Sequence, residues 1–206
     1  MVIGVDFDNT IICYDQLFHR IALQQGLIPS EVPATKSHVR DYLRQQGNED
    51  AWITLQGYAY GARVLEATPF PGVREFFARC KQQGIEVRII SHKTRYPFQG
   101  PRYDLHQAAQ QWLAACGCYD PLAGGISPDQ VFFELTKQGK LERIAEAGCE
   151  YFVDDLPEFL AEPRFPTQVK RMLFDPGGQY GAEQRFLRAA SWSEIEGIIF
   201  SAAVAS

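Results

Sequence analysis

The chain has 206 residues, of which 46% are apolar and 22% charged, and its formal net charge is −5. These values are typical of one medium-sized globular domain, or of a core with a smaller insertion. The acidic balance argues against a nucleic-acid partner, because such a partner needs a basic face. No apolar run approaches the roughly 18 residues of a membrane span, so we expect no membrane partner.

Cysteine usage and the start of the chain both favour a cytoplasmic protein. The five cysteines are an odd number without framework spacing, which predicts reduced thiols. Cys116 and Cys118 form a C-x-C pair with no second pair, so we interpret them as buried or half-buried side chains rather than zinc ligands. The first predicted strand begins at residue 2, which leaves no room for a signal peptide. We expect a monomer or a homodimer.

The first residues combine a strand with two acidic side chains. Val2, Ile3 and Val5 form an apolar run that predicts a buried strand of a parallel sheet. Asp6 and Asp8 follow at once, and residues two apart at a strand end point to the same side. Carboxylates this close repel each other and lose hydration. A cation between the two carboxylates would offset their repulsion, as would the use of one carboxylate as a proton carrier.

Residues 11–68 show helical spacing without any strand alternation. A first apolar stripe ends at Gly26, and two further helical segments follow the chain breaks at Pro29 and Pro33. The apolar positions are Leu17, Phe18, Ile21, Ala22, Val39, Tyr42, Leu43, Leu55, Ala59, Ala62 and Leu65. This stretch therefore predicts a small, all-helical insertion.

From residue 68 onward, strands and helices alternate. We predict strands at 85–90, 131–135, 151–153 and 169–174, and helices around 73–80, 105–116, 141–145 and 192–199. This alternation predicts right-handed crossovers and a parallel sheet with helices on both faces. In such sheets, ligands bind beyond the carboxyl ends of the strands.

Polar side chains stand at the ends of three predicted strands. Asp6 and Asp8 follow the first strand, Ser91 follows the strand at 85–90, and Asp154 and Asp155 follow the strand at 151–153. Their convergence at one edge of the sheet predicts an active site there.

Together, the Asp-x-Asp-x-Thr of residues 6–10, Ser91 and the Asp-Asp of residues 154–155 resemble the motifs of the haloacid dehalogenase superfamily of phosphohydrolases. The resemblance covers nearly the whole chain and implies a Rossmann-like, three-layer α/β fold with a parallel sheet. It implies a core of residues 1–12 and 68–206, and a helical cap of residues 13–67 that excludes water from the closed site. The implied reaction is Mg²⁺-dependent hydrolysis of a small phosphorylated metabolite. The acid at Asp8 favours phosphate esters, because dehalogenase-type members lack an acid at that place.

The resemblance also implies a role for each motif residue. Asp6 would attack phosphorus and form an aspartyl-phosphate that water then hydrolyses. Asp8 would protonate the leaving oxygen and later deprotonate the water. Mg²⁺ would be held by the carboxylates of Asp6 and Asp155 and the backbone carbonyl of Asp8, with Asp154 in the outer shell. Ser91 and a lysine would bind the phosphoryl oxygens.

Two lysines are candidates for this role, since both follow the strand at 131–135. Lys137 stands closest to the strand end and precedes Leu141 and Ile144 with helical spacing, so we rank it first. Lys140 is the alternative.

Further candidates for substrate binding are the Thr10 hydroxyl and the loop at 92–102. This loop carries cationic side chains, including His92, Arg95 and Arg102, together with two aromatic residues. We expect it to line the substrate pocket and face the cap, although a solvated loop would have the same composition.

Other interpretations of the acidic motif stay open. Asp6 and Asp8 could form the DxD metal site of a nucleotide-sugar transferase, or a surface turn. An EF-hand fails, because position 6 of its loop would be Ile11 rather than glycine, and position 12 would be Leu17. The Asp-Asp pair alone would also suit a helix N-cap, and Ser91 alone would suit a cap or a turn. The Asp-Pro-Gly-Gly of residues 175–178 is most simply a turn.

Two other functions share these motifs. A phosphotransferase or mutase would differ only in the acceptor that its cap admits. A non-catalytic, receiver-like phospho-binding module would place its phosphorylated aspartate at the end of the third strand. Here the third strand ends in Leu135 and Thr136, which disfavours that interpretation.

Overall fold

The computed structural model describes residues 1–204 and consists of two compact units. Unit 1 comprises residues 1–11, 69–92 and the chain from 117 onward, and unit 2 comprises residues 12–68 and 93–116. Within the described chain, no helix combines the length and the apolar character that crossing a membrane requires.

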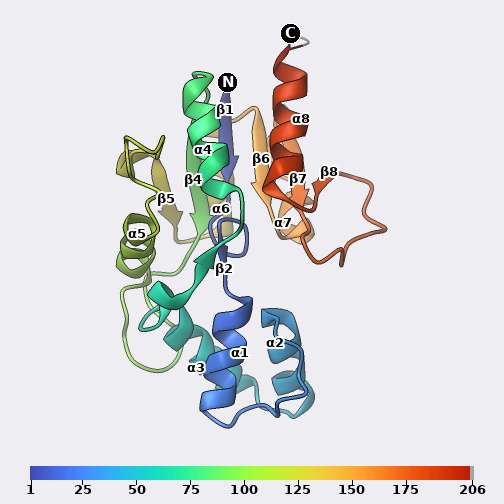
Figure 1. The fold of residues 1–206 in the computed structure, drawn as a ribbon. Coiled ribbons are helices and arrows are strands. Elements are labelled where there is room, and N and C mark those ends of the chain that lie inside the picture. Colours follow the sequence, from blue (N-terminus) through green and yellow to red (C-terminus); the bar gives the residue numbers. More distant parts are fainter. Residues whose placement is uncertain (205–206) are drawn as a thin grey trace. The chain divides into compact units, whose positions relative to one another are not determined.

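Unit 1 is built on a six-stranded sheet in the order β5-β4-β1-β6-β7-β8, and all paired neighbours run parallel (Figure 1). The strands are β1 (Val2–Val5), β4 (Glu86–His92), β5 (Val131–Glu134), β6 (Tyr151–Asp154), β7 (Lys170–Phe174) and β8 (Leu187–Ala189). The chain proceeds from β1 outward to β5 on one side and, from β6, outward to β8 on the other. The order therefore reverses between β1 and β6, which is where ligands bind in sheets of this kind.

Helices cover both faces of this sheet, as the sequence predicts (Figure 1). Helices α4 (Val73–Gln82) and α8 (Trp192–Val204) pack together on one face, while α6 (Lys137–Glu146) and α7 (Pro157–Leu160) pack on the other. Adjacent residues of β7 point to opposite faces of the sheet. Leu173 lies in the core under α6 and α7, and the Phe174 ring lies 5.9 Å from that of Trp192. Because strand side chains alternate between faces, one strand supplies both cores.

The predicted elements of unit 1 are confirmed, and the structure adds three short ones, namely β8, α7 and a 3₁₀ helix. β8 and α7 carry no readable pattern, since β8 has three residues, of which Leu187 and Arg188 are exposed, and α7 has four. The strand predicted at 85–90 extends through Ser91 to His92. A short 3₁₀ helix, η2 (Pro128–Gln130), precedes β5.

Unit 2 consists mainly of helices, namely α1 (Asp15–Gln24), α2 (Lys36–Gln45), α3 (Glu49–Tyr60), the 3₁₀ helix η1 (Val64–Glu66) and α5 (Leu105–Ala115). The prediction that residues 11–68 contain no strand is wrong in one detail. β2 (Ile12–Cys13) pairs with β3 (Thr68–Pro69) where the chain passes between the units. Strands of two residues are too short to produce an alternating pattern.

Residues 93–116 group with unit 2, which differs from our placement of all of residues 68–206 in the core. Two glycines at the end of α3 allow this. A Cβ on Gly57 would come 2.7 Å from the Pro97 side chain, and one on Gly61 would overlap the Tyr103 ring. The loop therefore lies directly against the α3 backbone, an approach that larger residues would block.

Candidate active site

The acidic motif follows β1 in a tight turn. The Asp6 N–H donates to the Val153 carbonyl at 2.9 Å, which extends the β1–β6 pairing by one residue. Asn9 has φ = 57°, and the Ile11 N–H donates to the Phe7 carbonyl at 3.1 Å. Among the described residues, Asn9 alone has a positive φ without being glycine, and asparagine tolerates that region better than most side chains. The turn holds Asp6 at the carboxyl edge of the sheet with only 5% of its surface exposed.

The end of this turn is fixed by the last helix. The indole Nε1 of Trp192 donates to the Thr10 carbonyl at 3.1 Å in a buried contact. The Thr10 hydroxyl is buried too and lies 3.5 Å from Asp155 Oδ1, at the outer limit of a hydrogen bond. Sequence reasoning missed Trp192, because its helix shows only an apolar pattern. The indole positions the motif loop.

The two aspartates after β6 complete an acidic cluster. Asp154 is fully buried, and its Oδ1 accepts from the Leu156 N–H at 2.9 Å. Asp155 is half-buried. One carboxylate oxygen each from Asp6, Asp154 and Asp155 lie within 4.8 Å of one another. An all-oxygen set of this size fits a hard divalent cation such as Mg²⁺.

Lys140 lies between two of these carboxylates. Its Nζ donates to Asp6 Oδ1 and to Asp154 Oδ2, both at 2.6 Å. The side chain is buried and its Nζ is 4.0 Å from the Phe159 ring centre. Helix α6, which carries it, starts after the N-cap Thr136, whose hydroxyl accepts from the Gly139 N–H at 2.9 Å. The lysine thus reaches the acidic cluster from the first turn of a capped helix.

Our ranking of the two lysines is reversed by this geometry. Lys137 is exposed and pairs with Glu162 at 3.6 Å, away from the carboxylates that Lys140 contacts. Helical spacing puts both lysines on the face of Ile144, but Lys137 is the first residue of α6. Helical side chains tilt toward the N-terminus, so Lys137 projects beyond the start of the helix. Sequence spacing predicts on which face of a helix a residue lies, but it does not predict how far along the helix the residue lies.

Burial and charge oppose each other in this cluster. Burial lowers the pKa of the Lys140 ammonium, but the charges of Asp154 and Asp6 and the hydrogen bonds to both outweigh it, so the pKa lies above its ordinary value. Burial raises the pKa of Asp154, with Asp6 adding to the shift and Lys140 opposing it. Lys140 is therefore charged at neutral pH and offsets part of the negative charge.

The other candidates in unit 1 lie at the same edge of the sheet. Ser91 is almost fully buried and stands two residues beyond Ile89, which pairs with Val5 of β1. His92 ends β4 with its side chain exposed, and the partial loss of water around the ring lowers its pKa. Asp8 is half-buried in the turn after Asp6.

The two arginines predicted to bind substrate belong to unit 2. Arg95 Nε donates to Asp104 Oδ2 at 3.0 Å, and the Arg102 guanidinium lies 4.1 Å from the Tyr96 ring centre. Both have partners within unit 2. Within unit 1, the structure brings together Asp6, Thr10, Lys140, Asp154 and Asp155.

The chain has the fold of the haloacid dehalogenase (HAD) superfamily of hydrolases. It resembles a HAD family hydrolase from Deinococcus radiodurans R1 with bound phosphate and sodium, with a TM-score of 0.59, 14% identity, and 98% of this chain and 96% of that chain covered. A putative HAD-hydrolase, YfnB, from Bacillus subtilis bound to magnesium gives a TM-score of 0.56 at 14% identity, with 96% of this chain and 97% of that chain covered. A phosphoserine phosphohydrolase-like protein from Francisella tularensis gives a TM-score of 0.53 at 13% identity, with 96% of this chain and 98% of that chain covered. No family model and no curated protein matches the chain.

Proposed function

We propose that this chain is a Mg²⁺-dependent hydrolase of phosphate monoesters that acts on a small phosphorylated metabolite. One observation carries the proposal, namely that Asp6, Lys140, Asp154 and Asp155 meet at the carboxyl edge of β1 and β6. Two structures of the same fold support it, since one holds phosphate and the other magnesium. The oxygen ligands of the cluster are those that Mg²⁺ prefers.

The metal would be held by Asp6, Asp155 and the backbone carbonyl of Asp8. Asp154 suits the outer shell, because its Oδ1 accepts from the Leu156 N–H and its Oδ2 from Lys140. When bound, the cation neutralises charge on the phosphoryl oxygens. Lys140 and Ser91 supply donors to the same oxygens, and the short contacts of Lys140 hold its ammonium at the nucleophile.

Two carboxylates would divide the chemistry. An Asp6 oxygen attacks phosphorus and the bond from phosphorus to the leaving oxygen breaks, while Asp8 gives that oxygen its proton. Water then attacks the phosphorus of the aspartyl-phosphate, Asp8 takes a proton from the water, and the bond from phosphorus to Asp6 breaks. The half-buried position of Asp8 suits this exchange, since the side chain keeps access to water.

The deciding experiment measures Mg²⁺-dependent phosphate release from a panel of phosphorylated metabolites. Asp6→Asn should abolish release because it removes the nucleophile, while Asp129→Asn, an exposed aspartate of unit 1 outside the cluster, should retain it. Activity that survives Asp6→Asn would refute the mechanism. Transfer of phosphate to an added alcohol or sugar in place of water would identify a phosphotransferase, and a long-lived phospho-Asp6 would identify a phospho-binding module.

A further inference from the structure

Lys140 has aromatic as well as acidic neighbours in unit 1. Its Nζ lies 4.0 Å from the ring centre of Phe159 and 5.3 Å from that of Phe152. An ammonium has three N–H donors, and the hydrogen bonds to Asp6 Oδ1 and Asp154 Oδ2 use two of them. The ring face of Phe159 attracts the positive charge, but it offers no carboxylate or carbonyl oxygen that could draw the ammonium away from Asp6.

The position of the Phe159 ring is fixed by two other buried rings. Its centre lies 6.1 Å from that of Phe152 and 5.8 Å from that of Phe165, and the centres of these two rings are 6.0 Å apart. At most 4% of the surface of any of the three residues is exposed. Tilted and edge-on contacts of this kind orient aromatic rings. The Phe159 ring therefore has little freedom to turn away from Lys140.

The segment that supplies the acidic pair also supplies this ring. Strand β6 ends at Asp154, and Phe159 follows within the short helix α7. The Leu156 N–H donates to Asp154 Oδ1 at 2.9 Å, and the Phe159 N–H donates to the Leu156 carbonyl at 3.1 Å. The backbone of Leu156 thus links the carboxylate to the ring. A carboxylate and an aromatic face from one short segment therefore contact the same ammonium.

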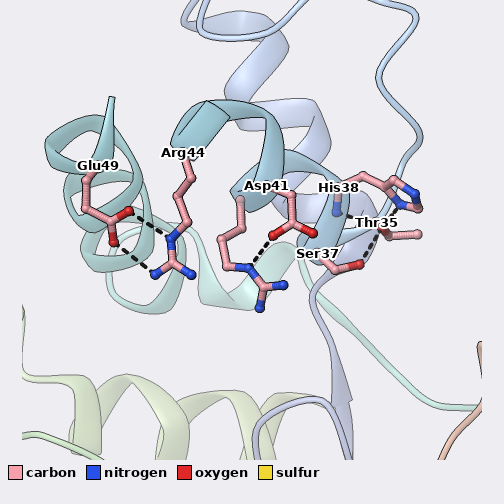
Figure 2. Close-up of polar contacts among 7 residues, drawn as sticks. Thr35, Ser37, His38, Asp41, Arg44 and Glu49 are labelled. Atoms are coloured by element: carbon pink, nitrogen blue, oxygen red, sulfur yellow. Dashed lines mark hydrogen bonds and ion pairs between the residues drawn. The ribbon is translucent and has the colours of Figure 1, made fainter. Parts of the chain in front are cut away.

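A surface ion pair of unit 2 shows how this environment differs from an ordinary one. Arg44 pairs with Glu49 at 2.8 Å, and the two side chains are 50% and 49% exposed (Figure 2). Water screens a pair of this kind, which therefore contributes little to stability. The Lys140 side chain is only 4% exposed, so its contact with Phe159 is largely sheltered from water. A cation–π contact is stronger when it is desolvated.

We propose that Phe159 is a positioning residue for the hydrolysis, because its ring face holds the Lys140 ammonium against Asp6 and excludes water from it. The role in catalysis rests on the proposed function of the acidic cluster. Water beside the ammonium would compete for its N–H donors and allow the lysine side chain to leave Asp6. With the ring in place, the ammonium stays at the nucleophile and needs no reorientation when charge develops on the phosphoryl oxygens.

Ring fluorination tests this role through kinetics, because fluorine withdraws electron density from the ring face and changes the ring shape little. Monofluoro-, difluoro- and trifluorophenylalanine at position 159 should lower kcat stepwise for the best ester of the panel, by about tenfold with the trifluoro ring, and leave KM unchanged. The matched control is the same series at Phe165, where the neighbouring cation is Arg171 at 5.3 Å and kcat should not change. A kcat that ignores fluorination at position 159, or an equal loss at position 165, would overturn the proposal and leave the proposed function standing.

A double-mutant cycle tests the contact without any turnover. Urea unfolding compares phenylalanine with trifluorophenylalanine at position 159, both in the wild type and in Lys140→Met. Fluorination should lower the folding equilibrium constant about fivefold in the wild type and leave it unchanged in Lys140→Met; Lys140→Gln takes the place of that variant if it does not fold. Equal effects in both backgrounds would overturn the proposal. If the wild type releases phosphate from no ester, the proposed function fails, and the cycle alone decides whether the ring holds the ammonium.

Discussion

Replacing Lys140 with methionine should nearly abolish phosphate release, whereas Lys137→Met should lose far less. Methionine keeps the length and apolar stem of lysine but removes the ammonium that contacts Asp6 and Asp154 at 2.6 Å. Removal of one positioned donor to a transition state lowers kcat by about 10²–10³. Lys137 is itself exposed and contacts the half-buried Glu162 at 3.6 Å, and such surface pairs contribute little.

The same substitution should also reduce stability. Lys140 is the partner of two buried carboxylates, and removing one member of a buried ion pair costs about 3–5 kcal/mol. Urea unfolding of both variants, with Lys81→Met as a control on the exposed side of α4, measures this loss. Mg²⁺ should restore part of the stability of Lys140→Met, because a cation near the same carboxylates replaces some of the lost charge.

The reasoning would be refuted if Lys140→Met unfolded like the wild type and released phosphate like Lys81→Met. It would also be refuted by a larger loss of activity in Lys137→Met than in Lys140→Met, since the ranking drawn from sequence spacing would then be right after all. A variant that is folded but inactive separates the two effects, because the circular dichroism spectrum reports folding independently of turnover.

Three further predictions follow from the packing and charge of unit 1. Gly4→Ala should destabilise the protein by about 1–3 kcal/mol in urea unfolding, because the new Cβ would lie 2.5 Å from the Phe152 ring; a stable variant would contradict this packing. Cys80 and Cys149 should resist alkylation by iodoacetamide at pH 8 and react faster as the pH rises, because burial raises their pKa to about 12 and about 11 and only the thiolate reacts; peptide mass spectrometry before and after unfolding measures this. Mg²⁺ should raise the melting temperature of the wild type, and Asp155→Asn should lose most of that increase because it removes a ligand oxygen; an equal increase in both would argue against this ligand.

The regular elements of unit 1 could be predicted because their patterns are long. The helix predicted around 73–80 is α4, and its apolar residues at 73, 76, 77 and 80, which have helical spacing, are all buried in the structure. The strand at 2–5 likewise appears at the expected residues, with Asp6 at its carboxyl end. Patterns of this length identify an element and its buried face. They also place the polar residues that follow the strands at one edge of the sheet.

Two kinds of feature could not be predicted from the pattern. Contacts between distant segments depend on side-chain size, as where Gly57 admits Pro97 and brings residues 93–116 into unit 2. Depth along a helix depends on where the helix begins, which local spacing leaves uncertain by a residue or two. That uncertainty was enough to exchange Lys137 for Lys140.

Residues that oppose ordinary stability gather around the acidic cluster of unit 1. In unit 1, Asn9 takes a left-handed conformation, and the ionisable side chains of Lys140 and Asp154 are buried. Departures from local rules concentrate at functional sites, where binding or catalysis offsets their cost.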